Sequence, residues 1–127
     1  MKVSIMSRSQ AETFEFLPNS QVVSITNKGG KRANITGTKD VLYLFFNDDD
    51  KDFSEDQAIL ILSFINSRRL YVHCDSGISR SAGVAAFLEE VGWQWVKLDG
   101  KLWTLEGWIE RYIPNQHVKN TLLKIYE

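Results

Sequence analysis

The chain contains very little cysteine or proline and no long apolar stretch. Its 127 residues include one cysteine and two prolines. One cysteine excludes an internal disulfide bond, so cysteine usage gives no indication of secretion. No stretch approaches the roughly 20 apolar residues that a membrane-spanning helix needs, and the opening residues lack the apolar core of a signal peptide. These absences predict a cytoplasmic protein that does not enter a membrane.

An excess of charge of one sign is also missing. The 15 basic and 16 acidic residues give a net charge of −1, so no overall field attracts nucleic acid or an anionic membrane surface. Hydrophobic residues make up 43% and charged residues 24% of the chain, which is typical of a globular protein. We therefore expect one domain spanning residues 1–127, a monomer with no nucleic-acid partner.

Short apolar segments alternate with amphipathic ones along the chain. The pattern predicts strands at residues 2–7, 21–26, 41–46 and 69–73, and helices at 9–16, 54–66, 81–91, 101–112 and 117–126. Ser9 with Glu12, and Ser54 with Gln57, have the spacing of capping boxes at helix starts. Two of the strands are continuously apolar, as in a parallel sheet buried on both faces. The sequence thus predicts an α/β fold with a mostly parallel central sheet flanked by helices on both faces.

The nine residues from His73 to Ser81 carry the chemistry, with the pattern H-C-x-x-G-x-x-R-S. A cysteine such as Cys74 is a nucleophile only as its thiolate, which requires positive potential around it. An arginine such as Arg80 offers a planar fork of donors that fits a phosphoryl group. The residues between them are small or flexible and can curl so that successive backbone amides converge on an anion.

The flanking segments fit that interpretation. A predicted strand precedes the motif and a predicted helix follows it, which is where free amides and the helix dipole hold an anion best. Gly77 would supply a positive φ or a close backbone approach within the loop. The full motif in this setting favours an anion-binding catalytic loop over a structural cysteine beside a surface charge.

This spacing resembles the signature loop of the cysteine-dependent protein tyrosine phosphatases. The resemblance implies that Cys74 is the nucleophile and that Arg80 binds the phosphoryl group. It implies that Ser81 hydrogen-bonds the sulfur and that His73 orients the loop. Phosphate would be bound by the residues that lie between Cys74 and Arg80, namely Asp75, Ser76, Gly77, Ile78 and Ser79. The mechanism implied by the family requires no metal ion and no organic cofactor.

A carboxylic acid must protonate the leaving group, and the run of residues 47–53 is its expected source. Residues 44–48, Leu-Phe-Phe-Asn-Asp, resemble the acid segment of dual-specificity phosphatases and assign the acid to Asp48. Asp49, Asp50 and Asp52 remain alternatives because segment boundaries shift by a few residues. A calcium loop is excluded, since Phe53 stands where the required glycine would be.

The resemblance implies a dual-specificity-like phosphatase that hydrolyses phosphomonoesters through a phosphocysteine intermediate. Its expected partner is a phosphorylated protein or peptide, with phosphotyrosine as substrate and phosphoserine and phosphothreonine as further candidates. Asp75 disfavours a polyanionic lipid headgroup through charge repulsion. Two alternatives stay open: a binding module that retains the loop without turnover, and an RNA 5′-triphosphatase.

Overall fold

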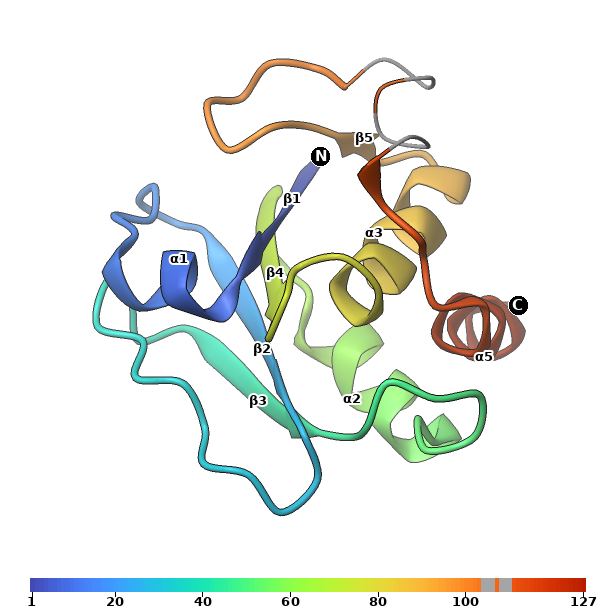
Figure 1. Cartoon of the computed structure of the whole chain (residues 1–127). Helices are drawn as coiled ribbons and strands as arrows, with labels where there is room; N and C mark the ends of the chain where they lie inside the picture. The colour runs from blue at the N-terminus through green and yellow to red at the C-terminus, as the bar shows by residue number, and fades with distance from the viewer. Residues whose placement is uncertain (104–106, 108–110) are drawn as a thin grey trace.

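The computed structural model describes residues 1–103, 107 and 111–127. Over these residues, the strands form one five-stranded sheet in the order β3-β2-β4-β1-β5, and every neighbouring pair is parallel. The strands are β1 (Lys2–Ser7), β2 (Gln21–Thr26), β3 (Val41–Phe45), β4 (Arg69–Cys74) and β5 (Gln94–Trp95). The predicted α/β fold with a parallel sheet is confirmed (Figure 1).

Helices cover both faces of the sheet. Figure 1 shows α2 (Glu55–Phe64), α3 (Arg80–Glu90) and α5 (Gln116–Tyr126) on one face. The short helix α1 (Arg8–Thr13) covers the other face with the irregular segments around Phe16 and Ile35. Strand residues alternate between the two cores because successive side chains point to opposite faces. In β4, for example, Val72 packs beneath α3 whereas Tyr71 packs on the α1 face.

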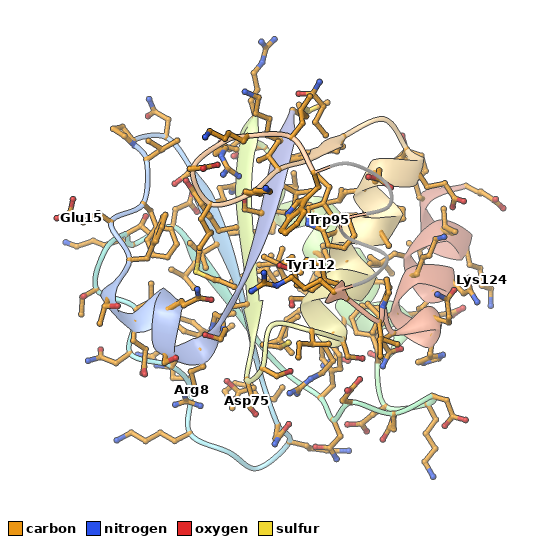
Figure 2. The ribbon with its side chains drawn as sticks, turned by 45° about the horizontal axis from the view of Figure 1, so that its top comes forward. Arg8, Glu15, Asp75, Trp95, Tyr112 and Lys124 are labelled. Atoms are coloured by element: carbon orange, nitrogen blue, oxygen red, sulfur yellow. The ribbon has the colours of Figure 1, made fainter. Side chains whose placement is uncertain are left out.

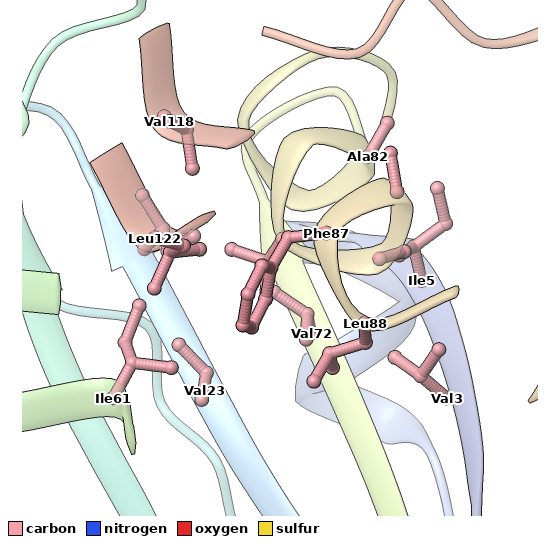
Figure 3. Packing of buried hydrophobic residues seen from close by; sticks show 14 of the residues in the cluster. Val3, Ile5, Val23, Ile61, Val72, Ala82, Phe87, Leu88, Val118 and Leu122 are labelled. Carbon is pink, nitrogen blue, oxygen red and sulfur yellow. The ribbon is translucent and has the colours of Figure 1, made fainter. Parts of the chain in front are cut away.

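The larger core explains why these helices lie where they do. Phe87 and Leu88 of α3 are buried over the central strands, with Val72 and Val3 beneath them (Figure 3). Leu122 of α5 closes the same core. Burial of an apolar side chain of this size contributes about 1.5–3 kcal/mol. The loop before α3 is therefore attached to a rigid base.

Several element boundaries differ from the sequence predictions. Helix α1 is capped by Ser7 with Gln10, so the predicted box of Ser9 with Glu12 is wrong, whereas the Ser54–Gln57 box of α2 is confirmed. The sequence pattern also missed the two-residue strand β5. The predicted helix 101–112 falls largely outside the described residues, and Leu102, near its expected start, makes an antiparallel bridge to Val96 instead.

The parallel arrangement gathers the strand ends at one edge of the sheet. Ser7, the last residue of β1, is in register with Cys74, the last residue of β4. The neighbouring strands β2 and β3 end together at Thr26 and Phe45. Loops that follow these strands meet at that edge, where α/β proteins place their ligands. Among the described residues, no helix is long and apolar enough to cross a bilayer.

Candidate active site

The signature loop, residues 75–79, joins β4 to α3 with Cys74 and Arg80 at its two ends. It is pressed against β1 at Gly77, which has a φ of +73°. A Cβ atom on Gly77 would lie 2.7 Å from the carbonyl carbon of Met6 and 2.8 Å from the amide nitrogen of Ser7. Only glycine fits this approach, as the sequence pattern predicted.

Three carbonyl groups of the loop accept hydrogen bonds from other segments of the chain. The Asp75 carbonyl accepts a hydrogen bond from the Arg8 amide at 3.2 Å. The Ile78 carbonyl accepts one from the Ile113 amide at 3.2 Å, and the Ser79 carbonyl accepts one from the Asn115 amide at 3.0 Å. No backbone amide of residues 75–79 donates to another described residue. The loop therefore presents consecutive unpaired donors, which is the arrangement of an anion nest.

Cys74 lies at the base of this loop and is almost fully buried, with 1% of its surface exposed. Its Sγ atom is 3.3 Å from the Oγ of Ser81, so the hydroxyl can donate a hydrogen bond to the sulfur. Helix α3 begins directly above, and its N-cap residue Ser79 makes no side-chain capping bond. The unsatisfied amides at this helix start add positive potential at the sulfur.

Arg80 is held in place by hydrogen bonds to two residues that are distant in the sequence, Asn27 and Phe46. One guanidinium nitrogen, Nη1, donates to the Asn27 side-chain oxygen and to the Phe46 carbonyl, both at 2.8 Å. The other, Nη2, lies 3.5 Å from a carboxylate oxygen of Asp75. Its Nε–H makes no hydrogen bond to a described residue. The bonds to Nη1 thus fix the orientation of Arg80, and the Nε–H group remains available to bind an anion.

Asp75 bridges two arginines at the mouth of the loop. Besides Arg80, the Arg8 guanidinium lies 3.9 Å from the other Asp75 carboxylate oxygen. Figure 2 shows Arg8 and Asp75 together at the carboxyl edge of the sheet. The sequence predicts that Asp75 disfavours a polyanionic lipid headgroup, but in the structure two cations, Arg8 and Arg80, partly neutralise its charge.

His73 is fully buried on the opposite side of β4 from Cys74. Its Nε2 atom lies 2.5 Å from the Ser24 hydroxyl on β2, and its Nδ1 atom lies 3.4 Å from the Cys74 carbonyl. Burial lowers the pKa of His73, so the ring is neutral at physiological pH. A neutral ring bonded between two strands orients the backbone at Cys74.

Asp48 reaches the signature loop from the segment after β3. Its Oδ1 atom accepts hydrogen bonds from the Ser79 hydroxyl at 2.9 Å and from the Asn115 side-chain amide at 2.8 Å. The structure therefore brings together Asp48 and the loop that contains Ser79, as the predicted acid position requires.

The other three candidate aspartates, Asp49, Asp50 and Asp52, do not contact the signature loop in the described part of the chain. Asp49 accepts the amides of Lys51 and Asp52, and these bonds lower its pKa. Asp52 accepts the Asn47 amide at 2.7 Å and pairs with Lys28. Asp50 is exposed and makes no contact with a described residue of the signature loop. Among these candidates, Asp48 alone contacts the loop within the described part of the chain.

Two site residues, Asn27 and Asn115, were not identified from the sequence. Asn27 follows β2 and binds Arg80, while Asn115 caps α5 and binds Asp48. Neither position has a local spacing that relates it to the motif. In the ranges 1–103 and 111–127 and at 107, no three His, Cys, Asp or Glu side chains form a group that could hold a metal ion.

Comparison with known proteins gives no relative from which the function of the site could be inferred. A scan against protein-family models finds no match, and searches of curated proteins and of solved structures also find none. What the structure offers for a functional assignment is the buried Cys74, the loop amides and Arg80 beside it, and Asp48 bonded to the loop.

Proposed function

We propose that this protein is a cysteine-dependent phosphatase that hydrolyses phosphomonoesters through a phosphocysteine intermediate. The observation that carries the proposal is the buried Cys74 sulfur beneath a loop whose backbone amides donate to no described residue. Successive backbone N–H groups of this kind, at the start of a helix, form a binding site for an anion. A tetrahedral phosphoryl group bonded to the sulfur would satisfy them.

Substrate binding would use the loop amides and Arg80. The amides of residues 75–79 would bind the equatorial phosphoryl oxygens, and the remaining donors of Arg80 would add a fork of charged hydrogen bonds. Because Asn27 and the Phe46 carbonyl already orient this side chain, little reorganisation is needed on binding.

In the first step, the Cys74 thiolate attacks phosphorus in line with the leaving oxygen. An S–P bond forms, the P–O ester bond breaks, and protonated Asp48 transfers its proton to the leaving oxygen. In the second step, a water molecule attacks the phosphocysteine while the Asp48 carboxylate removes its proton. The S–P bond breaks, inorganic phosphate is released, and the Ser81 hydroxyl stabilises the departing thiolate from 3.3 Å.

The natural substrate class that we infer is a phosphorylated protein, with phosphotyrosine first and phosphoserine and phosphothreonine next. We expect the enzyme to act as a monomer in the cytoplasm, where reducing conditions protect a lone cysteine nucleophile from oxidation. The proposed chemistry uses no metal ion and no organic cofactor.

The test is hydrolysis of para-nitrophenyl phosphate by the wild type and by Cys74→Ser and Arg80→Lys. Cys74→Ser should lose turnover while keeping the circular dichroism spectrum of the wild type, because the oxygen replaces sulfur in the same buried position. Arg80→Lys keeps the charge and loses the fork, so both kcat and kcat/KM should fall. Iodoacetate should inactivate the wild type, and vanadate should prevent that inactivation. Phosphate release that survives in Cys74→Ser would exclude this function, and vanadate binding without any turnover in the wild type would favour a binding module.

A further inference from the structure

A cavity of about 550 Å³ lies beside the signature loop, on the side of β1. We call it the side cavity. It is bounded by residues 5–7 of β1, residues 76–78 of the loop, residues 96–99 after β5, and the side chains of Trp103 and Tyr112. Because it shares the wall formed by the loop, a ligand in the side cavity would lie next to a phosphoryl group in the loop.

One wall of the side cavity is an open strand edge. Strand β5 pairs with β1 only at Lys2 and Val3, and the Val96 amide donates to the Val3 carbonyl at 2.9 Å. The chain then leaves β1 in a turn, in which the Lys97 amide donates to the Lys101 carbonyl.

Ile5 lies two residues beyond Val3, so its N–H and C=O face the same edge of the sheet. Neither group is bonded to another described residue. An edge of this kind is a template for an added extended chain.

Two cations of the side cavity have no acidic partner among the described residues. Lys97 and Arg111 are both exposed, and neither makes an ion pair with a described residue. The Lys97 ammonium lies 4.7 Å from the ring centroid of Trp103, which keeps it at the rim of the cavity. Asp99, an acidic residue of the lining, accepts the Lys101 amide at 2.9 Å. Among the described lining residues, two cations, Lys97 and Arg111, thus outnumber one carboxylate, Asp99.

The aromatic side chains that line the side cavity, Trp103 and Tyr112, are held in place by ring contacts. Tyr112 stacks on Trp95 with ring centroids 5.5 Å apart and meets Trp103 edge to face at 5.7 Å. Trp95 and Tyr112 lie side by side in Figure 2, between the strands and α3. Burial raises the pKa of Tyr112, so its phenol adds no negative charge at neutral pH.

We propose that the side cavity binds the extended main chain of a phosphopeptide next to its phosphorylated residue, and that Lys97 and Arg111 select acidic side chains there. The proposal rests on the phosphatase function above and names its substrate class, acidic phosphoprotein segments. A polypeptide is the occupant because the N–H and C=O of Ile5, which no described residue binds, match a main chain, and a lipid headgroup or a nucleotide has no main chain. Lys97 and Arg111, which have no acidic partner in the described part of the chain, set the sign of the side chains.

The experiment compares two phosphotyrosine peptides that differ only in glutamates or glutamines beside the phosphotyrosine. Binding is measured with the Cys74→Ser protein, and kcat/KM is measured with the wild type. We expect the acidic peptide to be favoured about 4- to 25-fold at low salt, because two exposed ion pairs each change affinity by about 2- to 5-fold. Lys97→Gln with Arg111→Gln should remove that preference in both assays. Both side chains are exposed, so the replacements are compatible with the fold.

The matched control is Lys101→Gln, which removes an exposed lysine from the same turn but outside the cavity lining. It should keep the preference, and hydrolysis of para-nitrophenyl phosphate should be unchanged in both the double variant and the control. Methylation of a peptide-bond nitrogen beside the phosphotyrosine should weaken binding if the Ile5 edge is used.

Each negative result has a distinct meaning. Equal binding of the two peptides, or a preference that survives the double substitution, would refute the side-cavity proposal while para-nitrophenyl phosphate turnover still supports the phosphatase. Absence of that turnover would reject the phosphatase, and the binding assay would still decide the selectivity. Inhibition by a short RNA that matches inhibition by an acidic unphosphorylated peptide would mean general polyanion binding and would overturn the peptide assignment.

Discussion

Replacement of Gly77 by alanine tests the geometry of the signature loop directly. The residue has a φ of +73°, where an L side chain costs about 1–2 kcal/mol. The new Cβ would lie 2.7 Å from the Met6 carbonyl carbon, whereas carbon atoms prefer a separation of about 3.5–4.0 Å. The atoms it meets are backbone atoms of β1, so relief requires the loop to move by nearly 1 Å.

Two measurable effects follow from that displacement. Overpacking adds about 1–3 kcal/mol to the backbone cost, so the free energy of unfolding in urea should fall by about 2–5 kcal/mol. A misplacement near 1 Å in catalytic groups can cost about 100-fold in rate. We therefore expect kcat/KM for para-nitrophenyl phosphate to fall by about two orders of magnitude in Gly77→Ala, measured well below its unfolding transition.

Gly92→Ala is the matched control for the cost of placing an L side chain at a positive φ. Gly92 has a φ of +107° at the end of α3, and a Cβ there would meet no heavy atom within 4 Å. The free energy of unfolding of Gly92→Ala should fall only by the cost of the positive φ, about 1–2 kcal/mol. Its activity should equal that of the wild type. The reasoning fails if Gly77→Ala is as stable as Gly92→Ala, or if it hydrolyses the substrate at the rate of the wild type.

Further predictions concern the acid, the arginine and the buried histidine. Asp48→Asn should lower kcat by about 10²–10⁴-fold, whereas Asp50→Asn should leave it nearly unchanged, and the reverse pattern would move the acid to Asp50. Asn27→Ala removes one of the two groups that hold Nη1 of Arg80 and should reduce kcat/KM by about 10- to 150-fold, since hydrogen bonds to charged groups contribute about 1.5–3 kcal/mol. Burial lowers the pKa of His73, so the unfolded chain binds a proton more readily, and the free energy of unfolding should decrease as the pH falls below about 6.5. Urea titrations between pH 7 and pH 5 would show this slope, and a flat profile would contradict it.

The signature loop and most strands could be predicted because their signals are local. Continuous apolar runs and the fixed spacing from Cys74 to Arg80 are visible within a few residues of each other. The strand–loop–helix order around the loop follows from the same short window, and so does the positive φ of Gly77.

Local signals failed where distant parts of the chain decide the outcome. Two capping-box patterns overlap at the start of α1, and the one that forms depends on where β1 ends. The pairing of Ser7 with Cys74 carries β1 to Ser7, which places that serine at the cap and leaves Ser9 inside the helix.

The positioning residues were missed for a related reason. Asn27 is 53 positions from Arg80, and Asn115 is 67 positions from Asp48. An asparagine after a strand or before a helix is ordinary in any sequence, so only the folded arrangement reveals which group it binds. The two-residue strand β5 is likewise too short to show a period.

Asn115 joins the stability of the last helix to the order of the catalytic groups. Its side-chain oxygen accepts the Val118 amide at the start of α5, its amide group donates to Asp48, and its backbone donates to Ser79. A local unfolding event that releases the first turn of α5 would therefore also release the acid and one carbonyl of the loop. Through this linkage, we expect an oxyanion bound in the loop to slow hydrogen exchange of the Val118 amide, which lies outside the binding site.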